Sequence, residues 1–165
     1  MKHSLQTWLL AFRPKTLPAA IAPVIIGLSY AHYMGIFKPA IAFFTLFAST
    51  LIQIGTNLAN DVFDFEKGTD TEDRLGPKRV TQAGLLSPQQ VKKAMMITFL
   101  MALLIGCYLA WIGGWPIVII GSLAIISGIA YTGGPFPLGY NGLGDLFVFI
   151  FFGIIAVPGT YYLQG

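Results

Sequence analysis

The chain has 165 residues, of which 55% are hydrophobic and 10% are charged, and its formal net charge is +3 at pH 7. The low charge content and a mean hydropathy of +0.71 exclude an ordinary water-soluble domain, in which about a quarter of residues are charged. The small positive charge is explained by membrane topology, described below, so we expect no nucleic acid partner.

Four uncharged stretches are long enough to hold transmembrane helices, and they cover residues 16–37, 39–60, 94–144 and 146–165. A helix needs about 20 apolar residues to cross a bilayer. The third stretch therefore holds two helices, with a turn at 113–116. We predict an all-α bundle in one transmembrane domain over residues 1–165, with spans at about 17–36, 39–60, 91–112, 115–132 and 143–163. The sequence lacks the alternating segments of about ten residues that are typical of a membrane barrel.

The basic residues indicate the orientation of this bundle. With five alternating spans, nine of the ten fall on one side and only Lys38 falls on the other. The nine are Lys2, Arg13, Lys15, Lys67, Arg74, Lys78, Arg79, Lys92 and Lys93. The positive-inside rule predicts a cytoplasmic N-terminus and a cytoplasmic 61–93 loop in a multi-pass protein of the cell (inner) membrane.

Smaller features of the sequence predict how the helices begin and pack. Ser87 is a candidate N-cap, and Pro88 suits the first position of the following helix. Gly27, Gly106 and Gly121 are expected to allow close packing between helices.

Carboxylates are concentrated directly after the second predicted span, because six of the seven lie within residues 61–73. Polar side chains also line one face of that helix end, within an arc of about 100°. They are Asn57, Asn60, Asp61 and Asp64, with Gln53 one turn deeper. Such residues are costly in lipid, so we expect the stripe to face a cavity. An all-oxygen ligand set favours Mg²⁺; the alternative is a polar helix end solvated at the membrane interface.

Basic side chains follow the carboxylates, at Arg74, Lys78 and Arg79. This order suits a diphosphate, because metal ions take some phosphate oxygens and cationic side chains take others. The positive-inside topology alone explains Lys78 equally well, whereas a binding role is favoured for Arg79.

A third candidate region follows the fourth predicted span. Tyr131 precedes the glycine-rich segment 132–142, whose backbone can approach a ligand closely; an ordinary turn is the alternative. Asp145 comes shortly afterwards, at the start of the fifth span. A carboxylate within a span is a functional candidate by default, although solvation at the interface would also accommodate it. This segment and the 61–93 loop are predicted to face the same side.

The motif Asn60-Asp61-x-x-Asp64, followed by Arg79-x-x-x-x-Gly84, resembles the first aspartate-rich motif and the next loop of the UbiA superfamily of intramembrane prenyltransferases. Residues 13–18, 57–70, 76–77 and 131–145 resemble the menaquinone branch, which acts on 1,4-dihydroxy-2-naphthoate. This similarity covers nearly the whole chain. Family members have about nine spans and a second aspartate-rich motif, so the chain resembles the N-terminal half.

The resemblance implies a reaction. A polyprenyl group passes from polyprenyl diphosphate to 1,4-dihydroxy-2-naphthoate in the lipid bilayer, diphosphate and CO₂ are released, and demethylmenaquinone forms. It implies Mg²⁺ as the cofactor. Asn60 and Asp64 match the first two positions of the family's NxxxDxxxD pattern. The third position is Gly68, a departure, so Asp61 or Asp70 is expected to complete the ligand set.

The residues and the resemblance together give three sets of candidate site residues. The catalytic set is Asp61, Asp64 and Tyr131. The substrate-binding set is Arg13, Asn57, Arg74, Lys78, Arg79 and Asp145. The metal-binding set is Asn60, Asp61, Asp64 and Asp70. Two alternatives stay open: a prenyltransferase with another aromatic acceptor, or a non-catalytic membrane transport or assembly subunit. The 165 residues alone are expected to be inactive.

Overall fold

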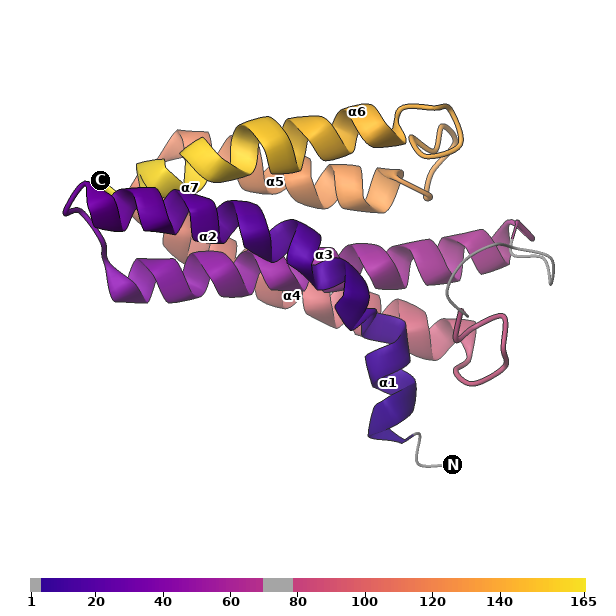
Figure 1. The fold of residues 1–165 in the computed structure, drawn as a ribbon. Coiled ribbons are helices and arrows are strands. Elements are labelled where there is room, and N and C mark those ends of the chain that lie inside the picture. The colour runs from indigo at the N-terminus through magenta and orange to yellow at the C-terminus, as the bar shows by residue number, and fades with distance from the viewer. Residues whose placement is uncertain (1–3, 70–78) are drawn as a thin grey trace.

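The computed structural model describes residues 4–69 and 79–165, and across these ranges the chain is helical without any strand, as predicted (Figure 1). Four main helices are α2 (Leu17–Tyr33), α3 (Pro39–Glu66), α4 (Pro88–Gly113) and α5 (Trp115–Ala130). The last helical segment comprises α6 (Gly144–Val148), a π-helical stretch η2 (Phe149–Ile155) and α7 (Ala156–Gln164). A short helix α1 (Leu5–Phe12) and a 3₁₀ turn η1 (Pro14–Thr16) precede them.

The helices define a multi-pass membrane protein. Within residues 4–69 and 79–165, four segments are long and apolar enough to cross a membrane: Leu5–Tyr33, Pro39–Glu66, Pro88–Gly113 and Gly144–Gln164. The predicted fourth span is helix α5, which has only 16 residues. At 1.5 Å per residue it is about 24 Å long, shorter than the roughly 30 Å hydrocarbon core.

Two predicted helix boundaries have the expected local chemistry. Ser87 caps α4 in a reciprocal box, in which its hydroxyl accepts from the Gln90 amide and the Gln90 side chain accepts from the Ser87 amide. Pro88 occupies the first turn, where no intrahelical donor is needed. Gly114 separates α4 from α5 with φ +71°, a value that favours glycine.

Helix α3 is the centre of the bundle, packing most extensively against α4 and also against α1, α2, α5 and α7. A side chain at Gly27 would lie 2.6 Å from the Val157 carbonyl oxygen, so glycine permits the contact between α2 and α7. The packing prediction is wrong for Gly106 and Gly121, where an added Cβ would have nothing within 4 Å, and both line a cavity instead.

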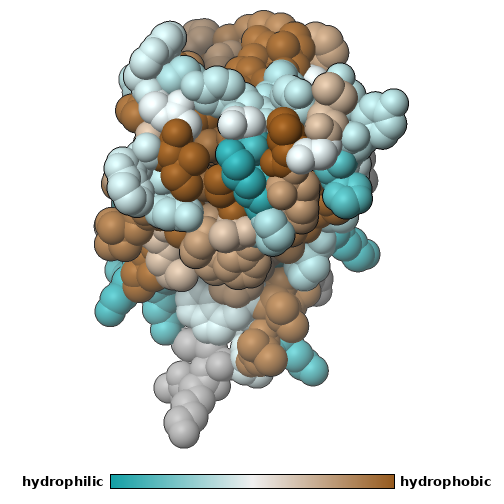
Figure 2. All heavy atoms as spheres, turned by 90° about the vertical axis from the view of Figure 1, so that its left-hand side faces the viewer, coloured by the Kyte–Doolittle hydropathy of each residue, from teal (hydrophilic) through white to brown (hydrophobic). Residues whose placement is uncertain are grey.

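The two ends of the bundle differ in chemistry. The glycine-rich loop and the segment leading into α4 lie at the right-hand end in Figure 1, while the turn before α3 and the C-terminus lie at the left. At the left end, the Lys38 amide donates to Gln164 Oε1 over 2.6 Å. Figure 2 looks onto that end and shows mostly apolar and weakly polar residues. At the right end, Arg13, Lys67, Arg79 and Lys92 contact groups on the last turns of α3 or in the glycine-rich loop.

Three features differ from the predictions. Helix α3 continues to Glu66, past the expected end at residue 60, so the first acids lie on its last turns. Helix α1 was not predicted; Arg13, with φ 53°, ends it, and α1 leaves the bundle at an angle in Figure 1. The π-helical turns of η2 were also unexpected, because such turns depend on packing more than on local sequence.

Candidate active site

Asp64 lies where the end of α3 meets the segment leading into α4 and the glycine-rich loop. Its side chain is buried and accepts two side-chain hydrogen bonds, from the Arg79 guanidinium at Oδ2 and from the Tyr140 hydroxyl at Oδ1. Arg79 is also buried, and the two form an ion pair. Because both side chains are buried, the positive charge of Arg79 compensates the negative charge of Asp64 in place of water. The structure therefore brings together Asp64 and Arg79, which the sequence indicated as separate candidate site residues.

Asp61 has different partners, although it lies less than one turn away. It is 1% exposed, and its two oxygens accept the backbone amides of Val80 and Thr81, each over 3.1 Å. Arg13 Nη2 is 3.9 Å from Oδ2. The carboxylate of Asp61 thus faces the segment that leads into α4 and not open space.

The rest of the polar stripe binds neighbouring segments. Asn57 Nδ2 donates to the Phe12 carbonyl oxygen over 2.9 Å and to Thr16 Oγ1 over 2.8 Å, which fixes the bend between α1 and α2. Asn60 Oδ1 accepts from Thr132 Oγ1 over 2.9 Å, which ties α3 to the glycine-rich loop.

The glycine-rich loop is held against the end of α3. Lys67 Nζ donates to the carbonyl oxygens of Thr132 over 2.7 Å and Gly134 over 3.1 Å. It also lies 5.5 Å from the centre of the Tyr140 ring. The hydroxyls of Tyr140 and Thr69 are 2.8 Å apart. These contacts confirm that the two irregular segments lie at the same end.

Tyr140 is a further candidate site residue, which the sequence did not predict. Partial burial, and then its hydrogen bond to the Asp64 carboxylate, raises the pKa of the Tyr140 hydroxyl above its ordinary value. The phenol therefore stays protonated and can act as a donor at neutral pH. Thr132 and Lys67 were missed too. The available signal was the concentration of polar side chains in segments predicted to share one side.

Tyr131 and Asp145 have contrasting environments. Tyr131 lines the cavity described below, and a Cβ built at Gly144 would lie 2.7 Å from its hydroxyl oxygen. Gly144 thus leaves room for the tyrosine. Asp145 is exposed in the first turn of α6, where the helix dipole stabilises a negative charge. It does not line the cavity.

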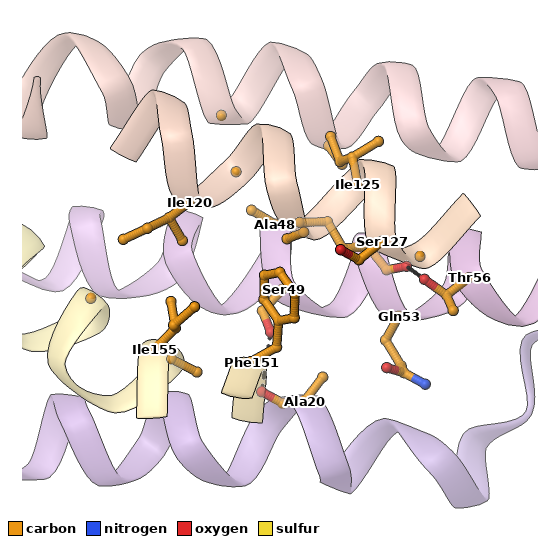
Figure 3. A pocket seen from close by; sticks show the side chains of 18 of the residues that line it. Ala20, Ala48, Ser49, Gln53, Thr56, Ile120, Ile125, Ser127, Phe151 and Ile155 are labelled. Atoms are coloured by element: carbon orange, nitrogen blue, oxygen red, sulfur yellow. Dashed lines mark hydrogen bonds between the residues drawn. The ribbon is translucent and has the colours of Figure 1, made fainter. Parts of the chain in front are cut away.

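A cavity of about 560 Å³ runs between α2, α3, α4, α5 and the last helical segment. Its walls are mainly apolar; Figure 3 shows Phe151 and Ile155 from η2 beside Ile120 and Ile125 from α5. The larger polar side chains that line it are Arg13, Gln53, Asn57, Asn60 and Tyr131, and the hydroxyls of Thr45, Ser49 and Thr160 are also among its lining residues. The volume is in the range of small-molecule sites.

The cavity corrects one prediction. Gln53, Asn57 and Asn60 line it, but Asp61 and Asp64 do not, so the prediction that the whole stripe faces a cavity is wrong for these two acids. The physical reason is that the segment beginning at Arg79 and the Tyr140 loop cover the last turn of α3.

The side chains of Asn60 and Asp64 offer oxygen atoms, the ligand atoms that Mg²⁺ prefers. Across residues 4–69 and 79–165 no group of three or more His, Cys, Asp or Glu side chains forms a metal cluster. Mg²⁺ sites often use only one or two carboxylates plus substrate phosphates, so the residues fit such an ion. Asp70, Arg74 and Lys78 lie outside the described residues.

Comparison with known proteins places the chain in a class. Residues 20–165 match the UbiA prenyltransferase family, and the chain belongs to that family. It is 43% identical over 165 residues to the 1,4-dihydroxy-2-naphthoate octaprenyltransferase of Escherichia coli, a match that covers 96% of this chain and 54% of that protein. The protein of the same name from Haemophilus influenzae is 37% identical, with 99% and 56% covered.

A cyanobacterial relative extends the comparison. The 2-carboxy-1,4-naphthoquinone phytyltransferase of Synechocystis is 32% identical over 162 residues, with 95% of this chain and 50% of that protein covered. The chain spans about half the length of the curated relatives it matches. No solved structure matches it significantly.

Proposed function

We propose that the chain is part of a Mg²⁺-dependent polyprenyltransferase that prenylates 1,4-dihydroxy-2-naphthoate. The main support is the Asp64–Arg79–Tyr140 cluster, which lies one helical turn beyond Asn60, a residue on the wall of a mainly apolar cavity. The names of the relatives support the donor and the acceptor. A lipid diphosphate needs this combination, because its tail requires apolar walls and its head group requires cations.

The apolar and polar residues of the chain have separate roles in this proposal. The walls from α2, α5 and η2 enclose the prenyl chain and exclude water from the reacting carbon. Arg13 and Arg79 bind diphosphate oxygens, and Asn60 and Asp64 supply oxygen ligands for Mg²⁺. When bound, the metal neutralises the charge of the leaving diphosphate. Asp70, Arg74 and Lys78 remain proposed contributors.

The bond changes balance without an added oxidant. The allylic C–O bond breaks, and its electron pair leaves with the diphosphate. The ring carbon bearing the carboxylate forms the new C–C bond. That carboxylate departs as CO₂, and its electron pair restores the aromatic ring. The immediate product is the dihydroxy, reduced form of demethylmenaquinone. Tyr131, on the cavity wall, and Asp145 are proposed to contact substrate during these steps.

Asp64 is a better candidate ligand than Asp61 because of what already binds each acid. Side chains hold Asp64, and side chains can rotate away when a cation arrives. Backbone amides hold Asp61. In the proposed orientation this end of the bundle, with the N-terminus, faces the cytoplasm, and the membrane is the cell's inner membrane.

A transfer assay tests the proposal. Membranes containing the complete protein should prenylate dihydroxynaphthoate in the presence of Mg²⁺ and should not use 4-hydroxybenzoate. Product from 4-hydroxybenzoate alone would favour a prenyltransferase with another acceptor. Absence of product from both would favour the non-catalytic alternative.

A further inference from the structure

The two acids at the end of α3 bind different kinds of donor. Asp64 accepts from two side chains, whereas both oxygens of Asp61 accept from consecutive backbone amides, those of Val80 and Thr81, each over 3.1 Å. Hydrogen bonds to an ionised carboxylate are stronger than neutral ones. Moving Asp61 onto a metal would strand two buried amides, which is costly.

We propose that Asp61 is a positioning residue that fixes Arg79 for diphosphate binding, and that it is not a metal ligand. The inference rests on the proposed function of the site. Val80 and Thr81 directly follow Arg79, so the carboxylate of Asp61 holds the backbone immediately beyond the arginine. The Arg79 side chain then reaches Asp64, three residues farther along α3.

Local packing supports this anchoring role. Val80 is 1% exposed and belongs to the same apolar cluster as Leu58 and Val62 of α3. The turn closes on itself, because the Ala83 amide donates to the Arg79 carbonyl oxygen over 3.0 Å and the Leu85 amide donates to that of Val80, also over 3.0 Å. The polar anchor at Asp61 and the apolar anchor at Val80 together hold the position of Arg79.

The negative charge of Asp61 also acts on a second cation. Arg13 lies 3.9 Å from Asp61 Oδ2 and lines the cavity. One buried carboxylate thereby holds both the backbone just after Arg79 and the side chain of Arg13 near the end of α3. An asparagine has the same shape but cannot replace it, because its amide nitrogen would face a backbone N–H and its charge is lost.

The test is a double-mutant cycle in the complete protein with Asp61→Asn and Arg79→Ala. Asp61→Asn should raise the KM for prenyl diphosphate by about tenfold, the scale of one lost charge-assisted hydrogen bond. In the Arg79→Ala background the same change should have a clearly smaller effect, namely the part that acts through Arg13. The Mg²⁺ concentration for half-maximal activity should not change in Asp61→Asn.

A matched control is Glu66→Gln, because Glu66 lies on the same helix with its side chain 44% exposed and forms an ion pair with Lys92 at the surface. It should leave KM unchanged. A large shift in the Mg²⁺ requirement of Asp61→Asn would overturn the proposal, and so would additive effects of the two substitutions. If Asp61→Asn does not fold, Asp61→Glu keeps the charge on a longer arm and should show a smaller KM change, again coupled to Arg79.

Hydrogen exchange gives a readout without turnover. In the metal-free wild-type protein the Val80 and Thr81 amides should exchange slowly, and Asp61→Asn should expose them while Glu66→Gln should not. Fast exchange at both amides in the wild type would overturn the proposal. This exchange measurement also separates the positioning role of Asp61 from the proposed function. Protected amides in a protein that prenylates neither acceptor would refute only the proposed function.

Discussion

Asp64 shows how a single side chain can connect parts of the chain that are distant in sequence. Its partners, Arg79 and Tyr140, are 15 and 76 residues away. The carboxylate, guanidinium and phenol form a polar group near the end of α3, beyond the polar stripe of that helix. Both partners are side chains, which suits the proposed binding of a cation and a phosphate at this site.

Replacing Tyr140 with phenylalanine tests the contribution of its hydroxyl. Tyr140→Phe removes one donor to Asp64, so we expect kcat/KM to fall roughly fivefold, the scale of one hydrogen bond. Because the pKa of Tyr140 is raised, this contribution should be constant below the ordinary tyrosine pKa and should disappear as pH rises through the higher folded value. A pH–rate profile of the wild type and the variant measures both the fall in kcat/KM at neutral pH and its disappearance at high pH. Equal rates for wild type and variant across neutral pH would contradict the role.

Local pattern predicted some of these residues but not their pairing. Asp64 and Arg79 were identifiable because acids and bases cluster after a span. Tyr140 was not, because nothing in a glycine-rich segment indicates which side chain returns to α3. Asp61 was expected to face a cavity, since helical periodicity gives a face but does not identify the segment that covers it.

Among the elements, long uncharged apolar stretches predicted the main helices well. The starts of α3, α4 and α5 follow from proline and capping residues in the sequence. The π-helical η2 and the separate helix α1 could not be predicted, because both depend on contacts made after folding. The packing prediction was right for Gly27 and wrong for Gly106 and Gly121, because a small residue permits either close helix packing or an open cavity wall.

Two glycines make this distinction testable. Gly27→Ala would place a methyl group 2.6 Å from the Val157 carbonyl oxygen, so it should destabilise the α2–α7 contact by about 1–3 kcal/mol. Gly121→Ala is the matched control; nothing lies within 4 Å there, and alanine favours the helix. Thermal unfolding of the purified complete protein should show a lower midpoint for Gly27→Ala only. Equal midpoints would contradict the packing.

At the scale of the whole molecule, charge is separated between the two ends of the bundle. Arg13, Lys67 and Arg79 contact groups at the end of α3 that carries the acids, and Lys38 lies at the other end. Single cysteines test the resulting orientation in a Cys107→Ser background. Gln89→Cys should react with an impermeant thiol reagent only after the inner face is opened, and Phe37→Cys should react from outside. The reverse pattern would invert the topology.

Residues 1–165 expressed alone should not prenylate dihydroxynaphthoate above background. The chain spans about half the length of its relatives. The second aspartate-rich motif that the family resemblance implies is not among these residues, so the metal and the diphosphate would lack part of their expected ligands. Purified chain with Mg²⁺ and both substrates provides the assay, and robust turnover would show that these residues suffice.

The most direct measurement uses dihydroxynaphthoate labelled at its carboxyl carbon, with membranes containing the complete wild-type protein or its Asp64→Ala variant. We predict equal amounts of labelled CO₂ and prenylated product from the wild type with Mg²⁺. Neither should form with excess chelator or with Asp64→Ala, although the variant should still be inserted in the membrane. Wild-type yields from Asp64→Ala, or undiminished yields in chelator, would contradict the assignment of this site.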